Sequence, residues 1–145
     1  MAEHKIRLTW NDGGKPFTYE AYPRAHEIAF KDGQQAVTVS AAPAYKGDGR
    51  HADPEDLLVA ALSSCHMLSF LAICTKKKVT VQSYQDDATG FLENDGGTLW
   101  ITRVILRPKV VCSADAETLA HIHHLAHEAC FIANSVKTEV SVEPR

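Results

Sequence analysis

The sequence predicts an α+β fold, and three observations lead to this prediction. Short alternating segments separated by turns fill the first 46 residues. A long apolar segment with capping residues follows, and a second set of strands and a second helix complete the chain. The expected order is three strands, a helix, two strands, a helix and a strand, without the βαβ repeats of a parallel sheet. A chain of 145 residues is enough for one domain, expected to span 1–145.

The N-terminal region is expected to form an antiparallel meander. Its three strands are expected at 5–10, 26–30 and 36–40, and 17–22, where the alternation is less clean, is left open as a fourth. Asn11, Asp12, Gly13 and Gly14 form a strong hairpin-turn signal after the first of these segments.

The first helix has clear start and stop signals. Asp53 is a good N-cap, Pro54 suits the first helical position, and acidic residues follow at the positive end of the helix dipole. The stretch 57–74 is almost wholly apolar, and lysines at 76–78 follow at the negative end of the dipole. A helix that is apolar nearly all round must be buried on every side, which one chain of this size can hardly achieve. We therefore expect two subunits to enclose it.

The same stretch is long enough to raise the question of a membrane span. It contains Ser63, Ser64, His66 and Ser69, and nothing else in the chain indicates a membrane topology. We therefore expect a core helix and no membrane association.

Alternation and capping residues predict the strands and the second helix that follow the first helix. Strands are expected at 79–84, at 99–107 with a possible continuation over 109–112, and at 136–142. A second helix is expected over 114–133, capped by Ser113, with an apolar stripe through Leu119, Ile122 and Leu125.

Composition excludes several classes of function. Fifteen basic and eighteen acidic residues give a net charge of −3, so no basic excess is available to neutralise a nucleic-acid backbone. No positive segment followed by an apolar segment opens the chain, so we expect no secretory signal peptide. Four cysteines are too few for a disulfide-stapled domain, which favours the reducing cytoplasm.

Each cysteine has a packing interpretation and a chemical one. Cys65 lies inside the first helix, where a buried thiol is often only packing, and a helical neighbour such as His66 points about 100° away. Cys130 lies near the end of the second helix, where a thiol can move and close a disulfide with a sulfenic acid. Cys74 precedes three lysines that could lower its pKa, although packing is the simpler interpretation. Cys112 carries no chemical signal, and no Cys-x-x-Cys motif is present.

The second helix also carries a group of histidines. His123 and His127 share one helix face, and Cys130 is three residues further on, a spacing that a metal ion could use. The His-Glu-x-x-His order of zinc hydrolases is absent, and such histidine-rich faces are more often solvated. No Gly-x-Ser-x-Gly motif and no phosphate-binding glycine loop is present, so serine catalysis and nucleotide cofactors are unsupported.

Two segments resemble a known family. Residues 53–65 (DPEDLLVAALSSC) are similar to the Pro-Glu-x-Leu…Cys helix of the superfamily of osmotically inducible protein C and organic hydroperoxide resistance proteins (OsmC/Ohr). Residues 127–135 (HEACFIANS) are similar to its second-cysteine segment. The two cysteines are 65 positions apart and the order of strands and helices also fits, so the resemblance covers essentially the whole chain.

The resemblance assigns roles to four residues. It implies that Cys65 is the peroxidatic thiolate, that Cys130 is the resolving thiol, and that Glu55 orients an arginine against Cys65. Arg24 is the expected arginine, because Tyr22-Pro-Arg-Ala-His26 follows a Tyr-x-Arg-x-His pattern of one subgroup, and Arg50 is the alternative. The Gly-Arg-x-Gly form typical of the hydroperoxide-resistance branch is absent.

The resemblance also implies an overall architecture and a reaction. It implies an OsmC-like antiparallel sheet wrapped around long central helices, in an intertwined homodimer with active sites at the subunit interface. It implies a peroxidase without haem, flavin or metal that reduces alkyl or lipid hydroperoxides and is recycled by an external dithiol. Two other hypotheses stay open: a non-catalytic dimer that binds an apolar ligand, and a metal-binding module built on the histidines.

Helix geometry adds one constraint on the expected site. Glu55 and Cys65 are ten residues apart, which is about 15 Å along an unbroken helix. We therefore expect either a break near the start of the helix or a carboxylate supplied by the partner subunit.

Overall fold

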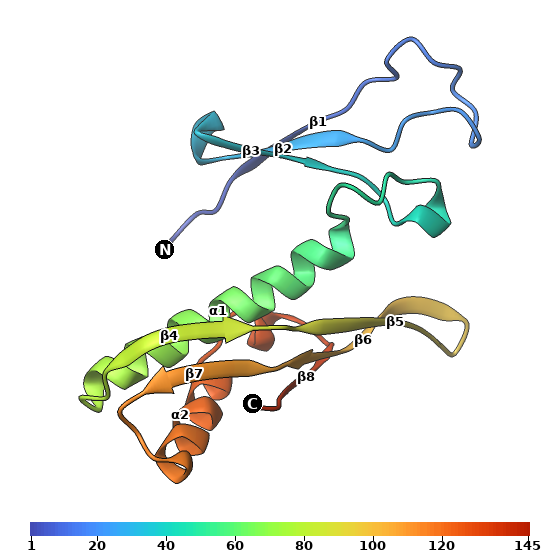
Figure 1. The fold of residues 1–145 in the computed structure, drawn as a ribbon. Helices are drawn as coiled ribbons and strands as arrows, with labels where there is room; N and C mark the ends of the chain where they lie inside the picture. The colour runs from blue at the N-terminus through green and yellow to red at the C-terminus, as the bar shows by residue number, and fades with distance from the viewer. The chain divides into compact units, whose positions relative to one another are not determined.

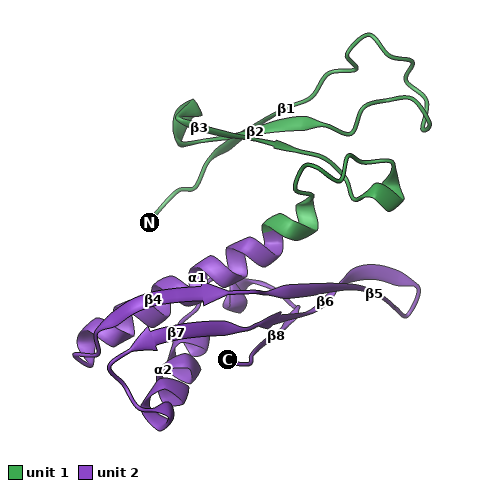
Figure 2. Cartoon of the chain, in the orientation of Figure 1, with its two compact units in different colours: residues 1–57 green, residues 58–145 purple.

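A computed structural model describes residues 1–145 and confirms the α+β class (Figure 1). The chain divides into two compact units, Met1–Leu57 and Leu58–Arg145, which are described separately (Figure 2). The first helix begins in the first unit and continues into the second. The structure contains three sheets, with strand orders β1-β2-β3, β4-β7 and β5-β6-β8.

The first unit contains one antiparallel sheet. Its strands are β1 (Ile6–Thr9), β2 (His26–Phe30) and β3 (Gln35–Val39), and β2 pairs with both neighbours. The segment 17–22, left open as a fourth strand, is not a strand, because it turns back on itself. The Thr18 carbonyl oxygen accepts hydrogen bonds from the amides of Ala21 and Tyr22, each at 3.0 Å.

The turn predicted after β1 is present, but it does not form a tight hairpin. Gly13 and Gly14 have φ values of +58° and +73°, which glycine adopts readily. The strand that pairs with β1 nevertheless begins only at His26, so the turn lies inside a long connecting loop.

Helix α1 (Pro54–Lys76) begins as predicted. The Asp53 carboxylate accepts a hydrogen bond from the Asp56 amide at 2.9 Å, and the Asp56 carboxylate accepts one from the Asp53 amide at 3.2 Å. This reciprocal arrangement satisfies two amide groups that a helix start would otherwise leave unpaired.

The end of α1 is closed by a Schellman motif. Lys78 adopts a left-handed conformation with φ of +60°, the Val79 amide donates to the Cys74 carbonyl oxygen at 2.9 Å, and the Lys78 amide donates to the Thr75 carbonyl oxygen at 3.2 Å. A lysine rather than a glycine occupies the left-handed position.

Helix α1 is apolar far beyond what its own chain covers. It is long and apolar enough to cross a membrane, with a mean hydropathy of 2.1, a test that core helices of soluble proteins also pass. Only 22% of this stretch is buried within the chain. The buried stripe runs through Leu62, His66, Phe70 and Cys74, whereas Leu68 on another face is 61% exposed.

The second unit contains the other two sheets. Its strands are β4 (Val81–Asp86), β5 (Thr89–Asp95), β6 (Thr98–Leu106), β7 (Pro108–Cys112) and β8 (Glu139–Val142). The sequence prediction missed β5 entirely. The segment 109–112 belongs to a separate strand that pairs with β4 rather than continuing β6. The last strand is shorter than the expected 136–142.

One pairing departs from the antiparallel expectation. Strand β8 runs parallel to β6, while β5–β6 and β4–β7 are antiparallel. The chain between β6 and β8 includes β7 and α2, which provides the long connection that a parallel pair requires.

Helix α2 (Ala116–Glu128) is shorter than the expected 114–133. Its N-cap is Asp115, whose carboxylate accepts a hydrogen bond from the Thr118 amide at 2.8 Å, so the prediction of Ser113 as cap was wrong. Ser113 instead accepts a hydrogen bond from the Thr80 amide at 3.0 Å.

The hydrophobic core of the second unit has two parts, and both include α1. Leu62 packs with residues of β6, namely Ile101, Val104 and Leu106. Phe70 and Cys74 pack with Ile122 and Ala126 of α2, with partly buried residues of β4 and β7 against them. The two helices therefore share one core with the strands that follow α1.

Candidate functional site

The two cysteines that the sequence singles out lie together in the second unit. Cys65 is partly exposed on α1, and Cys130 is buried two residues beyond the end of α2. Burial raises the pKa of the Cys130 thiol, and the neighbouring Cys65 thiol raises it further. The amide of Ala133 donates to the Cys130 sulfur at 3.4 Å and opposes this shift. Both cysteines are free thiols.

Cys65 opens onto an apolar hollow of about 520 Å³. Its lining comes from α1 and from the segment that follows α2: Ala61, Ser64, Cys65, Leu68, Ser69, Ala72, Phe131 and Ile132. Phe131, which follows Cys130 directly, is 81% exposed. An apolar hollow beside an accessible thiol suits a substrate with a hydrocarbon body.

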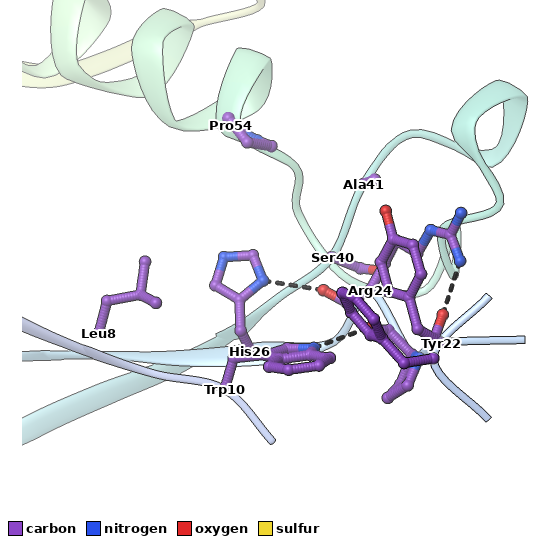
Figure 3. Close-up of a pocket in the computed structure, with 10 residues that line it drawn as sticks. Leu8, Trp10, Tyr22, Arg24, His26, Ser40, Ala41 and Pro54 are labelled. Carbon is purple, nitrogen blue, oxygen red and sulfur yellow. Dashed lines mark hydrogen bonds between the residues drawn. The ribbon is translucent and has the colours of Figure 1, made fainter. Parts of the chain in front are cut away.

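Arg24 lies in the first unit, where it holds its own loop together. Its guanidinium donates to the Tyr22 carbonyl oxygen at 2.6 Å (Figure 3). It also donates to the Tyr19 carbonyl oxygen at 2.6 Å and lies 3.6 Å from the centre of the Tyr22 ring. The Arg24 carbonyl oxygen is hydrogen-bonded to His26 Nδ1 at 2.8 Å. These contacts fix the arginine in a defined place.

Arg24 is one of the residues that line an apolar pocket of about 580 Å³. It is lined mainly by apolar and aromatic side chains of the first unit, among them Leu8, Trp10, Phe17, Tyr22 and Pro23 (Figure 3). Arg24 therefore presents its charge at the edge of an apolar surface.

Arg50, the alternative arginine, is bound to an aspartate close in sequence. Its guanidinium makes a forked interaction with the Asp48 carboxylate, with contacts of 2.6 to 3.1 Å. This pairing lowers the pKa of Asp48 and raises that of Arg50. The Arg50 side chain is 86% exposed, so the pair is a surface feature.

Glu55 lies in the first turn of α1. The helix continues from Pro54 to Lys76, so a break between Glu55 and Cys65 is excluded. About 15 Å of helix therefore separates the two residues within one chain. Of the two arrangements expected for Glu55, the break near the start of the helix is therefore wrong, and the carboxylate supplied by a partner subunit stays a prediction.

A buried histidine pair lies near the thiols and was missed at the sequence level. The Nε2 atom of His66 and the Nδ1 atom of His123 are 3.1 Å apart, and the two rings are nearly parallel, with centres 5.4 Å apart. His123 also stacks on Phe70, with ring centres 4.4 Å apart. Burial is the main cause that lowers the pKa of each histidine to about 4. Both imidazoles are therefore neutral at pH 7.

The histidines do not form a metal centre. No three histidine, cysteine, aspartate or glutamate side chains lie where they could hold one metal ion. His123 is engaged with His66, and Cys130 with Cys65. The alternative of a metal site built on His123, His127 and Cys130 thus has no support in the structure.

Cys74 differs from the sequence expectation. The lysines that follow it do not lower its pKa. Burial raises the pKa of Cys74, and the Cys112 thiol nearby raises it further.

Comparison with known proteins places the chain in a family. The family model described as OsmC-like protein matches residues 47–145. An OsmC-like protein of unknown function from Vibrio cholerae O1 is 44% identical, with 100% of both chains covered and a TM-score of 0.92. The uncharacterized protein YmaD of Bacillus subtilis is 22% identical over 148 residues, covering 99% of this chain and 93% of the relative.

A more distant structure shares the fold. The organic hydroperoxide resistance protein OhrB of Bacillus subtilis is 18% identical, with 99% of this chain and 98% of that chain covered and a TM-score of 0.73. The match over residues 47–145 and the close Vibrio relative agree with the motifs around Cys65 and Cys130. The chain belongs to the OsmC-like protein family.

Proposed function

We propose that this protein is a cysteine-based peroxidase that reduces organic hydroperoxides to alcohols. The observation that carries the proposal is the pair of neighbouring free thiols, Cys65 and Cys130, beside an apolar hollow. Structural neighbours described as organic hydroperoxide resistance proteins, including OhrB of Bacillus subtilis, support it.

The reaction needs only the two thiols and an external reductant. The Cys65 thiolate attacks the terminal oxygen of the hydroperoxide, the O–O bond breaks, and the alkoxide takes a proton and leaves as the alcohol. The Cys65 sulfenic acid then condenses with the Cys130 thiol, which forms a disulfide and releases water. An external dithiol reduces this disulfide by thiol–disulfide exchange.

Arginine assists the first step in this proposal. A guanidinium beside Cys65 favours the thiolate and polarises the peroxide bond, and a carboxylate such as Glu55 would hold it by paired hydrogen bonds. Arg24 and Glu55 would reach Cys65 from the partner subunit of a homodimer. The exposed apolar surface of α1 supports such a dimer, because water-exposed apolar area of this extent is unfavourable. The free thiols agree with a cytoplasmic location.

Replacement of single cysteines tests the mechanism. With a dithiol reductant present, Cys65→Ser should abolish the rapid consumption of cumene hydroperoxide. Cys130→Ser should stop turnover after one event and leave a Cys65 sulfenic acid that dimedone labels. Cys112→Ser is the matched control, and it should keep this rapid turnover. Full turnover by Cys65→Ser would refute the proposal.

A second function rests on the same hollow. Its apolar lining would also suit a non-catalytic protein that binds an apolar ligand in a stress response. In that case Cys65 should be inert to hydroperoxides and to alkylating reagents, while an apolar fluorescent probe binds and Leu68→Asp abolishes its binding.

A further inference from the structure

The other two cysteines of the chain are brought together at the far end of α1. The Schellman motif that closes this helix joins the Val79 amide to the Cys74 carbonyl oxygen at 2.9 Å. Such a motif is commonly accompanied by a side-chain contact across the helix end, and Cys74 and Val79 share one core cluster. Cys74 is therefore fixed against the residue that leads into β4.

Strand pairing brings Cys112 to the same place. In the antiparallel β4–β7 pair, Cys112 lies opposite Val81, and the Ser113 amide donates to the Thr80 carbonyl oxygen at 3.0 Å. Side chains alternate along a strand, so Cys112 shares a face with Val110, which packs in the same core cluster as Cys74. The cysteine from the helix end and the cysteine from the strand end thus face one core layer.

We propose that Cys74 and Cys112 are a second redox-active thiol pair, which organic hydroperoxides oxidise to an intrachain disulfide. The effect of the Cys112 thiol on the pKa of Cys74 is independent support, because thiols influence each other in this way only at short range. That a hydroperoxide is the oxidant rests on the proposed function. That the two thiols lie close together rests on the structure alone.

The two cysteines take different parts in the reaction. Cys112 is partly exposed, whereas Cys74 is 1% exposed. The Cys112 thiolate attacks the hydroperoxide, which yields the alcohol and a Cys112 sulfenic acid. The Cys74 thiol then condenses with it, forming the disulfide and water. The net change is oxidation of two thiols and reduction of one hydroperoxide.

This pair acts independently of Cys65. Nine residues of continuous helix separate Cys65 from Cys74, which is about 13 Å and too far for direct exchange between sulfurs. The chain therefore stores two pairs of reducing equivalents rather than one. Because Cys65 opens onto the apolar hollow that suits a hydroperoxide with a hydrocarbon body, the first pair is oxidised faster than the second.

The stoichiometry of hydroperoxide consumption tests the proposal. Fully reduced protein, freed of external reductant, should consume about two equivalents of cumene hydroperoxide per chain in a fast and a slow phase. Cys112→Ser should lose the slow phase and consume about one equivalent. A single equivalent for the unsubstituted chain would overturn the proposal.

Two complementary variants separate this proposal from the proposed function. Cys65→Ser/Cys130→Ser keeps only the second pair; after hydroperoxide its two free thiols should disappear, and a peptide linking Cys74 to Cys112 should appear under non-reducing conditions. The same free thiols persisting after hydroperoxide and after diamide would overturn the second pair. Cys74→Ala/Cys112→Ala keeps only the first pair, and its turnover with an external dithiol reports on the proposed function alone.

Discussion

The two units of the chain solve the burial of apolar side chains in different ways. The second unit encloses a packed core in which Leu62, Phe70 and Ile122 are fully buried. The first unit has one sheet, and of its large apolar side chains only Val39 is fully buried, whereas Phe17 is 77% exposed. A segment of this size rarely supports a core of its own. The second unit therefore contributes most of the buried apolar packing that stabilises the chain. The first unit leaves most of its large apolar side chains exposed, which favours contact with another protein surface.

The thiols and the arginine follow the same division. Cys65 and Cys130 lie in the packed unit, Cys65 on α1 and Cys130 just after α2. Arg24 lies in the open unit, fixed by the carbonyl oxygens of its own loop. A homodimer in which the open unit of one protomer covers the apolar surface of the other would bring these groups together.

The largest expected effect concerns the core of the second unit. Phe70→Ala should lower the free energy of unfolding by about 3–5 kcal/mol, because it removes a fully buried ring. Phe17→Ala is the matched control from the first unit and should lower this free energy by much less, because the ring is 77% exposed within its own chain. Urea denaturation measures both. Equal losses would contradict the division between the units.

The next effect concerns the arginine of the open unit. Arg24→Lys should lower kcat/KM for cumene hydroperoxide by about 100-fold, because lysine cannot reproduce the planar fork of the guanidinium. Arg50→Lys should leave kcat/KM unchanged, since Arg50 is exposed and bound to Asp48. The reverse pattern would assign the active-site role to Arg50.

Acid should destabilise the second unit through its histidine pair. The pKa values of His66 and His123 are about 6.5 in the unfolded chain and are lowered to about 4 in the folded chain. Between about pH 6.5 and 4 the unfolded chain therefore binds more protons than the folded chain does. The free energy of unfolding should therefore fall as the pH falls through this window, with a slope of about 1.4 kcal/mol per pH unit for each histidine.

Removal of both imidazoles tests the origin of this slope. The double variant His66→Phe/His123→Phe should flatten the pH dependence, while His121→Gln, on the exposed face of α2, should retain it. An unchanged slope in the double variant would show that the histidine pair is not its source.

The smallest effect concerns the start of α2. Asp115→Ala should lower the free energy of unfolding by about 1 kcal/mol, because the Thr118 amide loses its partner. Ser113→Ala should cost less, since Ser113 does not cap the helix. Thermal denaturation of the two variants distinguishes these residues.

Local signals predicted the elements that local chemistry determines. Asp53 and Pro54 marked the start of α1 because capping depends on neighbouring residues. Strand β5 was missed because Thr89–Asp95 includes glycine, asparagine and acidic residues, which are uncommon in strands. The need for glycine at position 90 follows only from tertiary packing, because an added Cβ atom there would lie 2.5 Å from the Val59 side chain of α1.

The candidate site was predictable only in part. Family resemblance, rather than residue spacing, indicated Cys65 and Cys130 as a pair, and the structure shows them in contact. The pairing of His66 with His123 joins residues 57 positions apart and depends on how α1 and α2 pack. The parallel pairing of β6 with β8 likewise depends on tertiary packing, which alternation along one strand does not reveal.

The most direct test of the central claim is to map the disulfides after oxidation. Reduced protein is treated with one equivalent of cumene hydroperoxide, digested without reductant and analysed by mass spectrometry. The predicted result is a peptide that links Cys65 to Cys130, formed as the hydroperoxide disappears. Unconsumed hydroperoxide with both thiols still free would contradict the claim that these two cysteines carry the reaction.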